Sequence, residues 1–211
     1  VAPLNSAELA AWVPQDGDTL LLKSGVTYTA SSMPTISVSN VSIRADGVGS
    51  KPVLSGAATQ STWTYDAGNN VYASPAYADK NVGIVLENGV PMKLKTWNTN
   101  LATTAAAMAT GSSAVAGRWA GSYTFNPNTN ILYIRPSSGT TTGKTYTTTS
   151  NSGFSTQAGG CGLNLSGASE SSRMTNMLVE GIKFTNITRH GIFSANIDGL
   201  RVLNCEMQFI G

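Results

Sequence analysis

The residues best suited to proton transfer in this chain lie between positions 183 and 206. The single histidine, His190, follows Arg189 in the segment Thr-Arg-His-Gly-Ile, and histidine is the residue type that exchanges a proton near neutral pH. Lys183 and Glu206 add an amine and a carboxylate, groups that act as general bases or hold a charged substrate. The candidate catalytic residues are therefore Lys183, Arg189, His190 and Glu206.

Each of these candidates also has a structural interpretation. The segment around His190 can form an ordinary turn before Gly191. Lys183 and Glu206 can form a surface ion pair, which is worth ~0.2–1 kcal/mol.

A repeat of 23 residues positions these candidates. Residues 176–187 and 199–210 superimpose so that their apolar positions coincide, and these positions alternate with polar ones, as is typical of strands. A fixed offset of this length predicts a solenoid, in which each repeat forms one coil that stacks on the next at a ~4.7 Å spacing. The matched pairs, which we expect to face the core, are Met177 with Leu200, Val179 with Val202, Ile182 with Cys205, Phe184 with Met207, and Ile187 with Ile210.

The same register places the polar candidates on the outer face of the stack. Lys183 falls opposite Glu206, and Arg201 projects outward as a candidate substrate-binding residue. No metal site is assigned: Glu180 and Glu206 fall on non-adjacent positions, and Ca²⁺ needs about six to eight oxygen ligands. Calcium binding is left open, because the sequence identifies no ligands for the ion. The sequence also lacks a glycine-rich phosphate loop, a nucleophile elbow and a zinc spacing.

Shorter alternating segments precede the repeat. Residues 5–12 predict a short helix with a capping box, which we expect to cover the open end of the stack. Residues 1–61 then form this cap and the first strands, and residues 137–211 form the later coils. Because residue 211 closely follows a strand, we expect the stack to continue through further chain or through a second polypeptide placed on the last coil. The predicted first strands are residues 17–29, 34–45 and 51–56.

Residues 62–136 break the pattern and predict an antiparallel insert that rests on the β-helix. Asn88-Gly89 and the segment from Asn126 to Asn130 are each flanked by alternating apolar residues, which is typical of β-hairpins. The insert is rich in tryptophan and tyrosine, which form either the core of a small unit or a stacking surface for sugar rings. The candidate substrate-binding residues here are Trp97 and Trp119.

Composition narrows the class of protein. Only 11% of the residues are charged, against a typical ~25%, and no run of basic residues is present, so we expect no nucleic-acid partner. No apolar stretch approaches the ~20 residues of a membrane span, and we expect no membrane partner. Cys161 and Cys205 fall on different strands, too far apart for the ~7 Å limit of a disulfide, so free thiols are favoured.

The order of the segments adds a resemblance. GDTLLLKSGVTYT, KPVLSG, LENGVPMKL, YTFNPNTNILYIRP, CGLNLSG, MLVEGIKFTNITRHGI and LRVLNCEMQFIG follow one another along nearly the whole chain. This succession resembles secreted bacterial proteins of the pectate-lyase-like superfamily. The resemblance implies an all-β, right-handed parallel β-helix with an N-terminal capping helix, an antiparallel β insert and an extracellular or periplasmic location.

The resemblance also implies a carbohydrate-related function. The superfamily contains polysaccharide lyases, glycoside hydrolases, uronan epimerases and noncatalytic adhesin and tailspike scaffolds, so the fold alone does not select an activity. Its lyases use Lys, Arg or His to remove the proton α to a uronate carboxylate, whereas its hydrolases use clustered carboxylates. Residues 137–211 contain a single aspartate. We therefore expect a polysaccharide lyase, with a glycoside hydrolase or a noncatalytic glycan-binding scaffold as the alternatives.

Overall fold

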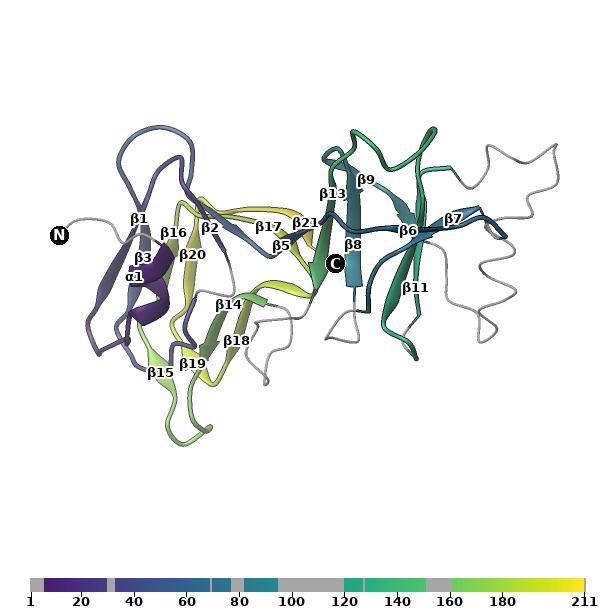
Figure 1. Ribbon diagram of the computed structural model, residues 1–211. Coiled ribbons are helices and arrows are strands. Elements are labelled where there is room, and N and C mark those ends of the chain that lie inside the picture. The colour runs from purple at the N-terminus through teal and green to yellow at the C-terminus, as the bar shows by residue number, and fades with distance from the viewer. Residues whose placement is uncertain are drawn as a thin grey trace. The chain divides into compact units, whose positions relative to one another are not determined.

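The structure, a computed structural model, describes residues 6–29, 33–68, 70–76, 82–94, 120–126, 128–150 and 161–210. The chain divides into two compact units, each of which we describe by itself. Unit 1 comprises residues 1–57 and 152–211, and unit 2 comprises residues 58–151. Strands dominate both units, and the described residues contain one short helix, α1 (Ser6–Ala11) (Figure 1).

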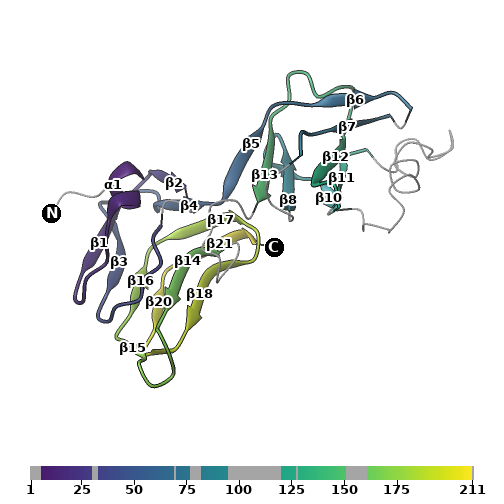
Figure 2. The ribbon, with the colours of Figure 1, turned by 60° about the horizontal axis from the view of Figure 1, so that its bottom comes forward.

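Unit 1 is a parallel β-solenoid, as the 23-residue repeat predicts. Its first sheet stacks four strands in the order β1-β3-β16-β20, and its second sheet stacks four in the order β2-β4-β17-β21 (Figure 2). A third stack pairs β14 with β18, and an isolated bridge adds Ile36 beside Leu165. The bounds are β1 Thr19–Lys23, β2 Thr27–Thr29, β3 Ser42–Asp46, β4 Val53–Ser55, β14 Cys161–Ser166, β16 Leu178–Glu180, β17 Lys183–Ile187, β18 His190–Ala195, β20 Arg201–Leu203 and β21 Glu206–Ile210.

The predicted register is confirmed. Val179 pairs with Val202, and Phe184 pairs with Met207, each across a parallel ladder. The core columns run through the earlier coils as well, since Leu54 lies opposite both Tyr28 and Phe184. All three of these side chains are buried, with at most 1% of their surface exposed. In α1, Leu9 is also fully buried in this core, so the predicted N-terminal helix packs on the solenoid; Asn5 of the predicted capping box lies outside the described residues.

Glycine makes room for Phe184, one of the largest side chains in the core of unit 1. A Cβ atom on Gly162 would lie 2.4 Å from Cδ1 of Ile187 and 3.0 Å from Cδ1 of Phe184. Side chains cannot approach so closely, so the third stack can pack against the aromatic ring only because β14 carries glycine at this position. The ring of Phe184 is 0% exposed as a result.

Asparagine forms one corner of the coils, ahead of the first sheet. Asn40 and Asn176 both adopt left-handed backbone, with φ of 59° and 54°. Asparagine tolerates this conformation better than most residues. The side-chain amide of Asn40 donates to Asp16 at 3.0 Å, and that of Asn176 donates to Asn40 at 3.0 Å, so the corner side chains link successive coils. A short parallel pair, β15 (Met174–Thr175) and β19 (Ile197–Asp198), lies just before this corner.

The last coil departs from the prediction in burial. Val202 and Met207 occupy core columns, yet they are 42% and 55% exposed. Their equivalents one coil earlier, Val179 and Phe184, are 0% exposed because another coil stacks on them. Among the described residues, no strand pairs with the outer edges of β20 and β21, so Val202 and Met207 keep the predicted core register but lack the burial of core residues.

Unit 2 interrupts a single coil of the solenoid. The chain passes from β4 of the second sheet into unit 2 and returns at β14 of the third stack. The interval predicted for the insert, 62–136, lies inside unit 2, which also contains residues 137–150 that the sequence analysis assigned to the later coils.

Two sheets form unit 2. Their orders are β10-β11-β12-β7-β6 and β5-β13-β8-β9. Both predicted hairpins are confirmed, because β8 pairs with β9 around Asn88-Gly89 and β11 pairs with β12 around Asn130. The bounds are β5 Ala57–Gln60, β6 Thr64–Asp66, β7 Val71–Ala73, β8 Val82–Glu87, β9 Val90–Pro91, β10 Lys93–Leu94, β11 Ser122–Asn126, β12 Ile131–Arg135 and β13 Tyr146–Ser150.

Candidate functional site

Two lysines and one glutamate form a charged cluster on the outer face of the second sheet. Phe184 points inward, so strand alternation turns its neighbour Lys183 outward, and the ladder places Glu206 opposite Lys183. Lys51 lies just before β4, and its Nζ atom is 2.6 Å from Oε1 of Glu206. Because β17 lies between β4 and β21, the Lys51 side chain spans that strand. We call Lys51, Lys183 and Glu206 the lysine cluster.

The charge state of the lysine cluster follows from these contacts. The hydrogen bond and charge of Lys51, with a smaller effect of Lys183, lower the pKa of the exposed Glu206 carboxyl. Glu206 is therefore ionised at neutral pH. An ionised carboxylate can hold an ammonium group or accept a proton, but it cannot donate one as a general acid.

The sequence prediction for this pair requires a correction. The facing positions of Lys183 and Glu206 are confirmed, but the ammonium group in contact with Glu206 belongs to Lys51. Lys51 is 155 residues from Glu206 in the chain, and sequence reasoning missed it. The short strand after Lys51 was predicted, but only the stacking of the coils places its first residue, Val53, opposite Lys183.

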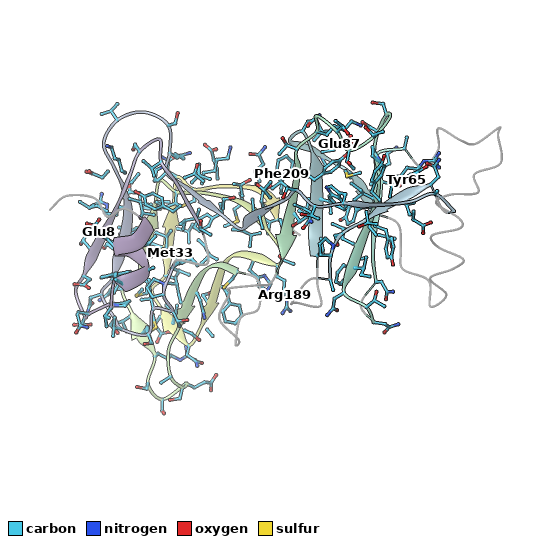
Figure 3. All side chains as sticks on the ribbon, viewed as in Figure 1. Glu8, Met33, Tyr65, Glu87, Arg189 and Phe209 are labelled. Atoms are coloured by element: carbon cyan, nitrogen blue, oxygen red, sulfur yellow. The ribbon has the colours of Figure 1, made fainter. Side chains whose placement is uncertain are left out.

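Arg189 and His190 lie at the other end of β17. Both are exposed, and His190 begins β18, where its ring lies 5.9 Å from the ring of Phe193. Arg189, labelled in Figure 3, comes two residues after the end of β17. The strand from Lys183 to Ile187 spans about 13 Å at ~3.3 Å per residue. The structure therefore does not bring the four predicted catalytic residues into one site.

The predicted substrate-binding residues are also separated. Arg201 is exposed on β20 of the first sheet, opposite Leu178, around a corner from the lysine cluster. The same sheet carries an outward ion pair in which Arg44 lies 2.8 Å from Glu180. Trp97 and Trp119 lie outside the described residues.

Unit 2 contains a second group of ionisable residues, which sequence reasoning missed. Oε1 of Glu87 lies 2.6 Å from Nζ of Lys144, and the side chains are only 6% and 14% exposed. The hydroxyl of Tyr146 donates to the same oxygen at 3.2 Å, and the backbone N–H of Ser137 donates to Oε2 at 2.9 Å. Lys144 also donates to the carbonyl of Ser138. Figure 3 labels Glu87 among the strands of this unit.

Hydrogen bonds determine the charge of Glu87. Burial alone would raise the pKa of this carboxyl, but the hydrogen bonds from Lys144 and Ser137 outweigh burial and lower the pKa. Burial, followed by the Glu87 charge, raises the pKa of Tyr146. Glu87 is thus held as an anion by a cation and neutral donors, while Tyr146 remains a protonated donor. Sequence alone could not reveal this group, because it depends on the pairing of β8 with β13, in which Tyr146 lies opposite Glu87.

A cleft of about 480 Å³ borders this group. Its walls include the ring of Trp63, which packs edge-on against Tyr146 with centroids 5.2 Å apart. Hydroxyl side chains line much of the remaining wall, among them Thr59, Thr141 and Thr142. The volume lies in the ~300–1,000 Å³ range of small-molecule sites. We call it the Trp63 cleft.

The described part of the chain also bears on metal binding, on the state of the cysteines and on membrane spanning. No group of three or more His, Cys, Asp or Glu side chains there is arranged to hold a metal ion. Both cysteines are free thiols; Cys161 is buried, which raises its pKa, and Cys205 is half-buried. The described helix is too short to cross a membrane.

These features define a parallel β-solenoid with an inserted β unit. No protein-family model matches the chain, and no curated protein matches it. A solved structure described as "Glycoside hydrolase" is similar, with a TM-score of 0.45 and 9% sequence identity. The match covers 81% of this chain and 43% of that chain, so the sequence spans less than half the length of the similar structure.

Proposed function

We propose that this chain is an extracellular carbohydrate-active protein that binds a uronic-acid polysaccharide at the lysine cluster. The observation that carries the proposal is the placement of two lysines beside one carboxylate: Lys183 and Glu206 lie on the neighbouring strands β17 and β21, and Lys51 lies just before β4. Two ammonium groups against one carboxylate leave an excess of positive charge, and the Glu206 side chain is 53% exposed. A substrate carboxylate can therefore share Lys51 and Lys183 with Glu206. The sequence resemblance to polysaccharide-acting β-helix proteins supports the sugar class.

The reaction that we propose is β-elimination. A base removes the proton on the carbon α to the uronate carboxylate, and the electrons of that C–H bond form a carbon–carbon double bond. The bond from the β carbon to the glycosidic oxygen breaks, and a proton from water completes the leaving hydroxyl group. Lys183, an ammonium group in the resting site, must lose a proton to solvent before it acts as the proposed base, and Lys51 stays an ammonium group that offsets the charge that develops on the substrate carboxylate.

The ionisation of Glu206 favours elimination over hydrolysis at this site. A glycoside hydrolase needs one protonated carboxyl as the general acid, with a raised pKa. The pKa of Glu206 is lowered instead, because Lys51 and Lys183 favour its charged form. Hydrolysis by a pair of carboxylates therefore has no support from the lysine cluster.

The test follows unsaturated product by ultraviolet absorbance, and reducing ends separately, on polygalacturonate, alginate and a neutral glucan. We expect unsaturated product from one uronate polymer, and at least a tenfold loss in Lys51→Ala and Lys183→Ala. Lys23→Ala removes an exposed lysine from the first sheet and is the matched control. Loss of product in His190→Ala alone would move the site to the other end of β17.

Two further outcomes separate the alternatives. Uronate binding that depends on Lys51 and Lys183, without any product, would establish the noncatalytic glycan-binding alternative. Neither product nor lysine-dependent binding across the panel would contradict the proposal.

A further inference from the structure

The Trp63 cleft belongs to unit 2 and shares no residue with the lysine cluster. The aromatic surface is fixed in place, because Trp63 packs against the buried Tyr146 and the core around Val85 and Leu132. Tyr146 is in turn held by its hydrogen bond to Glu87. A wall positioned in this way loses little conformational entropy when a ligand binds.

The cleft is polar but carries no uncompensated charge. Lys144 is the one charged residue among those described in its lining, and its ammonium group is bound by Glu87 and by the carbonyl of Ser138. The other polar side-chain groups of the lining are hydroxyls, the amide of Gln60, which donates to the carbonyl of Thr62, and the indole N–H of Trp63, which is buried without a partner among the described residues. An anionic ligand would therefore find no free cation in this lining, and a cationic ligand would find no free carboxylate.

An aromatic ring beside several hydroxyl groups suits a ligand with both an apolar face and many hydroxyl groups. Sugars have this chemistry, since their C–H groups pack on aromatic rings and their hydroxyls exchange hydrogen bonds with threonine. We propose that the Trp63 cleft binds a neutral saccharide unit, with the sugar face on Trp63 and the sugar hydroxyls directed at Thr141 and Thr142. Both this site and the lysine cluster would bind carbohydrate. They consist of different residues, however, and the Trp63 cleft suits a neutral sugar whereas the lysine cluster suits an anionic one.

The experiment measures the binding of three neutral trisaccharides, built from glucose, xylose and galactose, by calorimetry and tryptophan fluorescence. Trigalacturonate serves as the anionic comparison. We expect at least one neutral trisaccharide to bind and trigalacturonate to bind independently of Trp63. Trp63→Ala should weaken neutral binding at least tenfold, about 1.4 kcal/mol, whereas Trp63→Phe, which keeps an aromatic ring, should retain most of the affinity.

Two further variants guard against misfolding as the cause of any loss. Thr142→Tyr adds bulk at an exposed lining position and should block neutral binding without altering the core. Tyr65→Ala removes a 52% exposed aromatic ring outside the cleft lining and should leave binding unchanged.

The outcomes distinguish this inference from the proposed function. Loss of neutral binding in Trp63→Ala with no effect of Lys51→Ala supports the Trp63 cleft, whatever happens on uronate polymers. The absence of binding by any neutral trisaccharide at about 10 mM would overturn the inference, because a Kd above that concentration corresponds to a binding free energy weaker than ~2.7 kcal/mol. It would equally be overturned if folded Thr142→Tyr and Trp63→Ala bound as well as the parent, or if trigalacturonate bound through Trp63.

Discussion

Phe184 is the side chain on which the solenoid register can be tested most directly. Its ring is 0% exposed between Leu54 and Met207. Phe184→Ala should lower the free energy of unfolding by about 3–5 kcal/mol, the usual cost of removing a buried aromatic ring. The adjacent Thr185 faces the other side of the sheet and is also buried, but its side chain is much smaller, so Thr185→Ala should cost only about 1–2 kcal/mol. Denaturant titration measures both values, and equal losses would contradict the register.

Glu87 should make the stability of unit 2 sensitive to acid. Its pKa is lower in the folded state than the ordinary value of 4.5, so the folded state binds the proton less readily than the unfolded chain does. The resulting stabilisation is complete above that ordinary value and is lost as the pH falls through the folded pKa.

The measurement compares thermal unfolding of the parent and Glu87→Gln at several pH values. Glu87→Gln should lower the melting temperature at pH 7, because Lys144 loses its buried partner. The difference should shrink as the pH falls below 4.5 and through the lowered pKa of the folded carboxyl, where the parent carboxylate becomes protonated. A difference that is constant from pH 7 to pH 3 would show that the charge of Glu87 does not stabilise the fold.

The strands illustrate what sequence periodicity can and cannot predict. Alternation and the 23-residue offset predicted β16, β17, β20 and β21 with their register, because one coil's apolar face must match the next. Asn88-Gly89 predicted its hairpin because the turn depends only on local backbone conformation. The contact of Lys51 with Glu206 was not predictable, since it depends on which distant coil stacks on β17. For the same reason, no local sequence pattern predicts the pairing of β8 with β13 that places Glu87 opposite Tyr146.

The asparagine corner provides a test at the level of the coils. Asn176 combines a left-handed backbone with a side-chain hydrogen bond to Asn40. Asn176→Gly keeps the backbone accessible and removes the hydrogen bond, so it should cost about 0.5–1.5 kcal/mol. Asn176→Ala loses both features and should cost roughly 1 kcal/mol more. Chemical unfolding of the two variants separates the contributions, and equal costs would show that backbone conformation is not limiting there.

Apolar side chains in core positions are exposed at the end of the solenoid formed by β20 and β21. Val202 and Met207, together with Leu203, are exposed apolar side chains on strands with one unpaired edge in the described structure. Exposed strand edges of this kind favour association with other strands. A strand that paired with these edges would bury this surface.

Met207→Lys tests whether anything covers that surface in solution. Met207 is 55% exposed, so the substitution should change the free energy of unfolding by less than about 1 kcal/mol while reducing self-association. Unfolding and sedimentation velocity provide the two readouts. A loss as large as that of Phe184→Ala would show that Met207 is buried in the protein as it exists in solution.

During synthesis, β3 and β4 can pair with β1 and β2, which precede them in the chain, long before the partners of their other edges are made. Those partners, β16 and β17, follow unit 2 in the chain. At ~5–20 residues per second, translation needs on the order of ten seconds to pass from β4 to β16. The entropic cost of closing so long a loop grows only slowly with its length. The delay therefore affects the order in which the strands pair more than it affects the stability of the folded protein. Unit 2 can therefore complete its two sheets while β3 and β4 still lack their pairing with β16 and β17.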